Sequence, residues 1–210
     1  MIPFLLEAVV ISLSGIMAPG PLSASTISHG GHSPHAGARV ALGHGVVEFP
    51  LMALTLFGFG AILDIGFVRP VLFIAGGWVL AWMGVDMLQL ARSPIATAQQ
   101  TAAVRSPFMT GIALTGMNPY FLVWWVTVGA GLLIRASDHG AFGLLAFAIA
   151  HWLCDLGWLW MLSAAAFGGG RLLGDRFYRI VHGICGLFLL LAALDFLGDG
   201  WRHAEALFPV

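Results

Sequence analysis

Apolar residues dominate this chain in six long runs, and polar residues gather between the runs. The runs cover roughly residues 2–28, 38–63, 68–90, 108–133, 141–167 and 177–197. A helix needs about 20 apolar residues to cross the hydrocarbon core of a bilayer, and each run reaches that length. The pattern therefore predicts an all-α integral membrane protein with six transmembrane helices. The first run begins next to Met1 without a basic segment, so we expect a retained span and no cleaved leader.

Composition supports this class and excludes one kind of partner. Hydrophobic residues make up 59% of the chain and charged residues 9%, whereas a soluble domain carries about a quarter charged residues. All basic residues are arginines scattered near the ends of the runs, so the chain has no basic patch for nucleic acid. The expected partners are the lipid bilayer and a small-molecule or cation substrate. Assembly into a homo-oligomer is left open, and we expect no cofactor.

Two of the runs contain helix-breaking residues in their interior. Pro19, Gly20 and Pro21 interrupt the first run, and Asn118 with Pro119 interrupts the fourth. Proline has no backbone N–H and distorts a helix, so each break exposes backbone polar groups at membrane depth. Such groups persist only where protein or a wet cavity covers them. We therefore predict broken first and fourth helices whose open turns bind the polar groups of a substrate.

The second and fifth runs each carry a histidine four residues before a carboxylate. These pairs are His44 with Glu48 and His151 with Asp155. Four residues make about one helical turn, so the members of each pair share a helix face. A carboxylate deep in a bilayer is costly and is usually functional, and neither run holds a basic residue at its centre. A proton, an ammonium group or a metal ion is expected to supply the missing positive charge.

The two halves of the chain repeat each other. The histidine–carboxylate pairs lie 107 residues apart, and each half contains one broken run followed by two further runs. We expect a first three-helix repeat over residues 1–91, a connecting loop over 92–106, a second repeat over 107–199 and a tail over 200–210. Because three spans invert the second copy, the fold class is a 3+3 inverted-topology repeat.

Arginine positions and the remaining polar residues give secondary expectations. An N-terminus outside the cell places six arginines in the cytoplasm and three outside, which favours that orientation. The cytoplasmic set is Arg39, Arg92, Arg105, Arg171, Arg176 and Arg179. His29, His32 and His35 are expected in an ordinary polar loop, and Asp86 and Asp195 near span ends at the interface or in gating.

The sequence motifs resemble those of a transporter family. The Ala18-Pro19-Gly20-Pro21 break, the Gly43-x-Gly45 segment before Glu48, and GIALTGMNPYFLVWW over residues 111–125 are similar to the lysine exporter (LysE) superfamily of six-span permeases. The resemblance covers nearly the whole chain. It implies export of amino acids, or in related branches of divalent metal cations, driven by a proton or ion gradient. Tyr120 stands where amino-acid exporters of this type usually carry lysine, which leaves the substrate open.

Three candidate functions remain from the sequence, and the first two require no catalytic residues. The leading function is a plasma-membrane exporter of basic or small neutral amino acids, with substrate held by the nine residues of the breaks and pairs: Glu48, Asp155, His44, His151, Asn118, Pro119, Pro19, Gly20 and Pro21. The alternative is a transition-metal exporter, with His44, Glu48, His151 and Asp155 as candidate ligands. The third is a redox protein that uses the two histidines for haem and the thiols of Cys154 and Cys185 for electron transfer.

Overall fold

The computed structural model describes residues 1–58, 66–93 and 106–207, and within these ranges the chain is helical apart from short connections. The first half contains α1 (Ile2–Ile16), α2 (Pro21–Gly30), α3 (Ala36–Leu56) and α4 (Val68–Arg92). The second half contains α6 (Pro107–Gly116), α7 (Pro119–Trp124), the π-helix η2 (Trp125–Gly129), α8 (Ala130–Ser137) and α9 (Gly140–Leu207). Most of the expected connecting loop, residues 94–105, lies outside the described residues.

The helices have the lengths and composition of membrane spans. Five helical segments are long and apolar enough to cross a bilayer, and α9 contains two of them, Gly140–Gly169 and Tyr178–Glu205. The pair formed by α1 and α2 supplies a sixth span, bent by 79° at its break. The chain is therefore a multi-pass membrane protein, as the hydropathy pattern predicts, and the predicted breaks in the first and fourth spans are confirmed. The boundaries of the two repeats stay a prediction.

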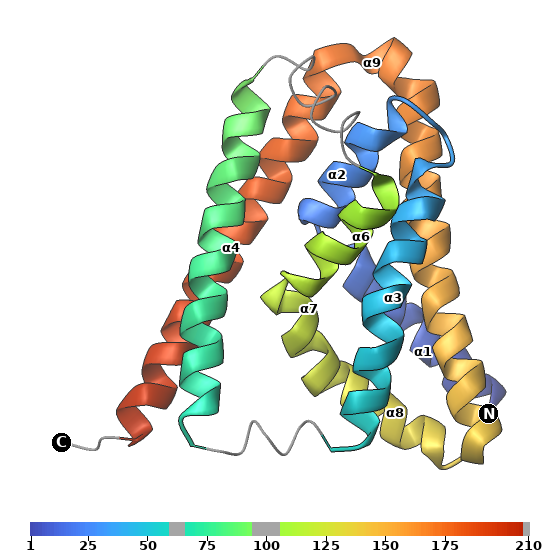
Figure 1. The fold of residues 1–210 in the computed structure, drawn as a ribbon, viewed down its shortest axis with the longest axis vertical. Coiled ribbons are helices and arrows are strands. Elements are labelled where there is room, and N and C mark those ends of the chain that lie inside the picture. Colours follow the sequence, from blue (N-terminus) through green and yellow to red (C-terminus); the bar gives the residue numbers. More distant parts are fainter. Residues whose placement is uncertain (59–65, 94–105, 208–210) are drawn as a thin grey trace.

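The helices form two groups, which are visible in Figure 1. On one side, α4 packs along the second part of α9, and on the other, the first part of α9 packs with α1, α2 and α3. Helix α6 packs against α3, and α7, η2 and α8 continue below it. The N-terminus and the end of α9 lie at one end of the molecule, and the bend of α9 lies at the other.

Several predicted boundaries differ from the structure. The glycines at 168–170 do not end a helix, because α9 continues through them to Leu207, and residues 200–207 of the expected tail are helical. His29 belongs to α2 and is buried, so the predicted loop shrinks to the few residues before α3. Pro50 lies inside α3, where it deprives the Val46 carbonyl of its helical N–H partner two residues from Glu48.

Glycines allow α3 to approach its neighbours at backbone contact. A Cβ atom at Gly111 of α6 would collide with the carbonyl oxygen of Val40, and one at Gly43 of α3 with that of Phe108. A Cβ at Gly37 would likewise meet the Leu159 carbonyl on α9. Helix α3, which carries His44 and Glu48, is thus clamped between α6 and the first part of α9.

We predict that Gly111→Ala lowers the thermal unfolding midpoint of the purified protein in detergent. The added methyl group has no space beside the Val40 carbonyl, and overpacking of this kind costs about 1–3 kcal/mol. Gly157→Ala is the matched control, since a Cβ on this helical glycine of α9 meets no atom within 4 Å. The close-packing account is wrong if both variants melt at the same temperature.

Candidate functional site

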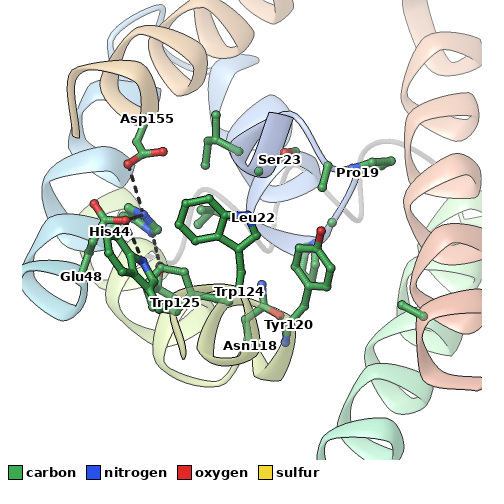
Figure 2. Close-up of a pocket in the computed structure, with 18 of the residues that line it drawn as sticks. Pro19, Leu22, Ser23, His44, Glu48, Asn118, Tyr120, Trp124, Trp125 and Asp155 are labelled. Atoms are coloured by element: carbon green, nitrogen blue, oxygen red, sulfur yellow. Dashed lines mark hydrogen bonds and ion pairs between the residues drawn. The ribbon is translucent and has the colours of Figure 1, made fainter. Parts of the chain in front are cut away.

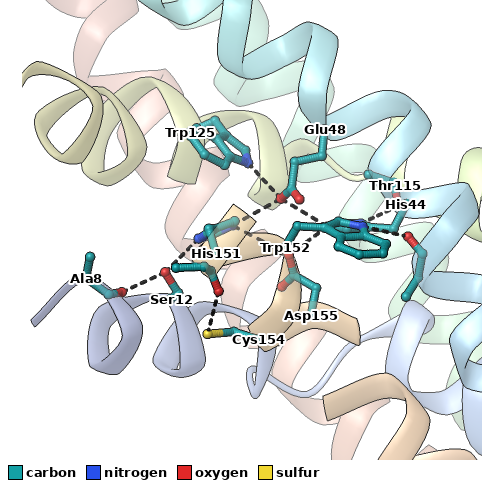
Figure 3. Close-up of polar contacts among 12 residues, drawn as sticks. Ala8, Ser12, His44, Glu48, Thr115, Trp125, His151, Trp152, Cys154 and Asp155 are labelled. Carbon is teal, nitrogen blue, oxygen red and sulfur yellow. Dashed lines mark hydrogen bonds and ion pairs between the residues drawn. The ribbon is translucent and has the colours of Figure 1, made fainter. Parts of the chain in front are cut away.

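The two histidine–carboxylate pairs meet in one group of polar contacts, as Figure 3 shows. Nε2 of His44 and Nε2 of His151 each lie 3.1 Å from Oε1 of Glu48. The same two nitrogen atoms lie 3.7 and 3.6 Å from Oδ2 of Asp155. Glu48 is 1% exposed and Asp155 is 2% exposed. Residues more than 100 positions apart in the chain thus form one buried cluster, which we call the central cluster.

Each histidine is also held by a hydroxyl group on a broken helix. Nδ1 of His44 on α3 lies 2.8 Å from Oγ1 of Thr115 on α6, close to the second break. Nδ1 of His151 on α9 lies 2.6 Å from Oγ of Ser12 on α1. Each of these bonds joins one half of the chain to the broken helix of the other half, so a movement of a break is transmitted to a histidine.

The hydrogen bonds fix where one proton lies in the cluster. The Ser12 hydroxyl donates to the Ala8 carbonyl oxygen at 2.6 Å, so it accepts from His151 and places a proton on Nδ1 of that ring. The contact between Nε2 of His151 and Oε1 of Glu48 is then attractive only if it also holds a proton, on either atom. Relative to two neutral imidazoles and two carboxylates, the geometry therefore requires one additional proton.

The remaining contacts leave the cluster with negative character. Oε1 of Glu48 also accepts from the indole N–H of Trp125 at 3.3 Å. Oε2 of Glu48 and Oδ2 of Asp155 are buried without a hydrogen-bond partner among the described residues. Two carboxylates and one additional proton sum to one negative charge. A second proton or one monovalent cationic group therefore brings the cluster to neutrality.

A cavity of about 80 Å³ connects the central cluster with both helix breaks (Figure 2). Its wall includes all four cluster residues, the segment from Pro19 through Pro21, and Asn118. A single water molecule needs roughly 10–15 Å³ of such space, so the cavity holds a few waters. Helix α2 begins at this cavity without a side-chain cap, and the first-turn residues Leu22 and Ser23 line it.

Eight of the nine predicted site residues line this cavity, and their role in binding stays a prediction. The exception is Pro119, which is buried facing Gly76 of α4, because a Cβ at Gly76 would lie 2.8 Å from the Pro119 ring. Asn118 caps α7, since its Oδ1 accepts from the Tyr120 N–H at 3.1 Å. The side chains of Tyr120 and Trp124 also line the cavity.

Sequence reasoning missed Ser12 and Thr115, and it left open whether Trp125 lines a cavity or faces lipid. Ser12 lies seven residues before Pro19, and Thr115 lies four residues before Pro119. Both spacings correspond to whole helical turns, so a hydroxyl residue on the same face as a break was the available signal. Trp125 carries no such signal, because nothing in its sequence context separates a core indole from a lipid-facing one.

The outcome for the cysteines and the loop histidines is mixed. Cys154 and Cys185 are free thiols. Cys185 lies on the second part of α9 and packs at its interface with α4. Cys154 lies on the first part of α9 and donates to the Ala150 carbonyl. The two thiols thus lie in different packing environments.

The histidines that were expected in a polar loop make specific contacts. His29 hydrogen-bonds Thr110 of α6 at 3.1 Å, and His35 accepts from the Trp160 indole, so both side chains are held by neighbouring helices.

We predict that Ser12→Ala destabilises the protein, because it leaves the buried Nδ1–H of His151 without an acceptor. An unsatisfied buried donor costs about 1–3 kcal/mol, which a chemical or thermal unfolding midpoint in detergent detects. Ser14→Ala is the matched control, since Ser14 is exposed on the same helix and bonds only the carbonyl of Ile11. Equal midpoints for the two variants would contradict the assigned hydrogen bond.

Comparison with known proteins identifies the family of the chain. The family model described as LysE type translocator matches residues 13–200. The "Putative amino acid efflux protein YcgF" of Bacillus subtilis (strain 168) is 24% identical over 202 residues, which cover 94% of this chain and 97% of the relative. The "Chemotactic transduction protein ChpE" of Pseudomonas aeruginosa is 28% identical over 205 residues, which cover 94% and 100%. No solved structure gives a significant match. The chain belongs to the LysE type translocator family.

Proposed function

We propose that the protein exports amino acids across the plasma membrane in exchange for protons. The observation that carries this proposal is the charge balance of the central cluster. Glu48 and Asp155 are buried, no arginine of the described part of the chain contacts them, and the hydrogen bonds account for one additional proton. One more monovalent positive charge makes the cluster neutral. A proton and a substrate ammonium group are alternatives for that position, so binding of one displaces the other.

The cavity offers the complementary group that a zwitterion requires. An α-carboxylate at the start of α2 would meet the N–H groups of Leu22 and Ser23, which have no acceptor within the helix. The positive end of the helix dipole favours an anion at the same place. The ammonium group would then lie toward Glu48 and Asp155. A cavity of about 80 Å³ favours a small neutral side chain, and a long basic one needs the site to open further.

The packing on the two sides of the cluster supports alternating access. Toward the end that holds the N-terminus, an apolar cluster that includes Phe4, Trp125 and Phe147 closes the interior. At that end, Arg135 of α8 forms a bidentate pair with Glu7 of α1, at 2.8 and 2.6 Å. We infer that these contacts form the outer closure and that they separate when the halves rock.

The similarity to known proteins supports export and leaves the substrate to experiment. One relative is named for amino acid efflux, and the name of the other refers to chemotactic transduction and states no substrate. Assignment to the plasma membrane is part of the proposal. It follows from the export function, since a substrate leaving the cell must cross that membrane.

Export of a divalent metal ion is the second candidate, and one observation favours it. His44, Glu48 and Asp155 each present one ligand atom, and these atoms lie within 4.8 Å of one another. The Nδ1 contacts to Thr115 and Ser12 are of the kind that orient metal-binding imidazoles. A divalent ion would have to displace the additional proton to reach a neutral cluster, and for this reason we place it second.

We predict that the purified protein in proteoliposomes transports amino acids when a proton gradient is imposed. Lysine, arginine, threonine and alanine form the test panel. Glu48→Gln and Asp155→Asn should each reduce the flux at least about tenfold, because each removes a charge that the ammonium group or proton must balance. Asp195→Asn on α9 is the control, since Asp195 lines neither the cavity nor the cluster.

Calorimetric titration of the same preparation separates the two candidates. Binding of an amino acid that the carboxylate variants lose supports amino-acid export. If only manganese, cobalt, nickel or zinc ions bind, and Glu48→Gln or Asp155→Asn abolishes that binding, the amino-acid proposal is wrong. If either carboxylate variant transports and binds as the unmodified protein does, the two carboxylates do not share one central site.

We predict a charge-swap rescue at the outer closure. Glu7→Arg and Arg135→Glu should each slow transport, and the double variant should recover most of the rate. Both side chains are about half exposed, so each single effect should stay within about fivefold, as for a surface ion pair. Arg202→Glu is the control, because Arg202 pairs with Asp199 within α9 alone. Absence of recovery in the double variant would exclude the pair as a closing contact.

A further inference from the structure

A second cavity, of about 460 Å³, lies between the two groups of helices. Helices α2 and α6 form one wall, and α4 with the second part of α9 forms the other. Pro21 lines both this cavity and the one at the central cluster. The two spaces are therefore neighbours, separated at the start of α2.

The second cavity offers two hydrogen-bond acceptors, on His182 and Asp86. His182 donates from Nδ1 to the Tyr178 carbonyl at 2.8 Å, which leaves Nε2 of the neutral ring as an acceptor. Asp86 of α4 lines the same cavity as His182. His29 and Thr110 bond each other at 3.1 Å across α2 and α6.

The charge of the cavity points to the class of ligand. Asp86 is the only fully charged side chain among the described residues that line it, and no described lining residue is an arginine. A carboxylate beside an imidazole acceptor suits a group that carries both positive charge and N–H donors. An ammonium group has this chemistry, whereas a carboxylate would be repelled by Asp86.

The position of the cavity relates it to one membrane face. The cavity extends along α2 and α6, from Pro21 at the start of α2 to the last turns of α2 and α4 and the first turn of α6, which lie toward the bend of α9. This end carries the exposed Arg39, Arg92, Arg176 and Arg179, and the N-terminus lies at the opposite end. The arginine distribution places this end in the cytoplasm, where an exporter takes up its substrate.

We propose that the second cavity is a cation-selective vestibule, in which Asp86 and His182 hold the ammonium group of a substrate on its way from the cytoplasm to the central cluster. The identity of that substrate rests on the proposed function. The charge selection does not, because it follows from the residues that line the cavity, and the cytoplasmic opening does not, because it follows from the arginine distribution.

The test uses cysteine labelling in membrane vesicles and needs no amino acid. In a Cys154→Ala, Cys185→Ala background, Ser25→Cys on α2 places a thiol in the cavity wall, and Ala113→Cys on α6 is a second, independent reporter. The probes are cationic trimethylammonium-ethyl methanethiosulfonate and anionic sulfonatoethyl methanethiosulfonate. Neither probe crosses the bilayer readily, and each rate is divided by its rate with a small thiol in solution.

The vestibule predicts reaction in inside-out vesicles and none in right-side-out vesicles. The normalised rate of the cationic probe should exceed that of the anionic probe at least about fivefold, as expected near an unpaired carboxylate. Asp86→Asn should bring the ratio close to one. Asp195→Asn, which removes the same charge outside both cavities, should leave the ratio unchanged.

Three results would overturn the vestibule. These are equal rates for the two probes, a preference that Asp86→Asn does not reduce, or no reaction from the cytoplasmic side with reporters that react after denaturation. Amino-acid flux together with any of these results would leave the proposed function standing. An Asp86-dependent preference without amino-acid flux would instead overturn the proposed function and keep the vestibule.

Discussion

Two carboxylates buried in a membrane protein constrain the rest of this structure. An ionised carboxylate in the bilayer is costly unless positive charge or hydrogen-bond donors lie beside it. Here Oε1 of Glu48 accepts from the indole N–H of Trp125 and lies 3.1 Å from Nε2 of both His44 and His151. Asp155 lies beside the same histidine nitrogens. The donors satisfy one oxygen atom of Glu48 and leave a charge that an exchangeable proton or cation must balance. In the function that we propose, transport depends on that remaining charge.

The broken helices and the close helix packing serve this cluster in different ways. Glycine contacts hold α3 against α6 and α9, so the pairs on α3 and α9 face each other at fixed distance. The breaks bring a cavity and an uncapped helix start to the cluster. Ser12 and Thr115 connect the broken helices to the histidines. The cluster is thereby joined directly to both broken helices, and the alternating access that we propose would use these connections.

Much of this arrangement follows from the sequence, and the limits have physical reasons. Hydropathy fixes the membrane class, and the spacing of His44 and Glu48 places both on one face of α3. The end of a helix is harder to predict, because each glycine costs a helix only about 1 kcal/mol relative to alanine, and α9 continues through three of them. The contacts of Ser12 and Trp125 depend on which helices become neighbours. Local patterns do not contain that information, and a repeat suggests it only in part.

The central claim is that a substrate ammonium group and a proton compete for one position in the cluster. Proton release on substrate binding tests this most directly, measured with a pH indicator in weakly buffered detergent solution. The account predicts release of about one proton for each amino acid bound, since the cluster balances one monovalent charge. It also predicts that Asp155→Asn abolishes the release. Tight binding without any proton release would contradict the account.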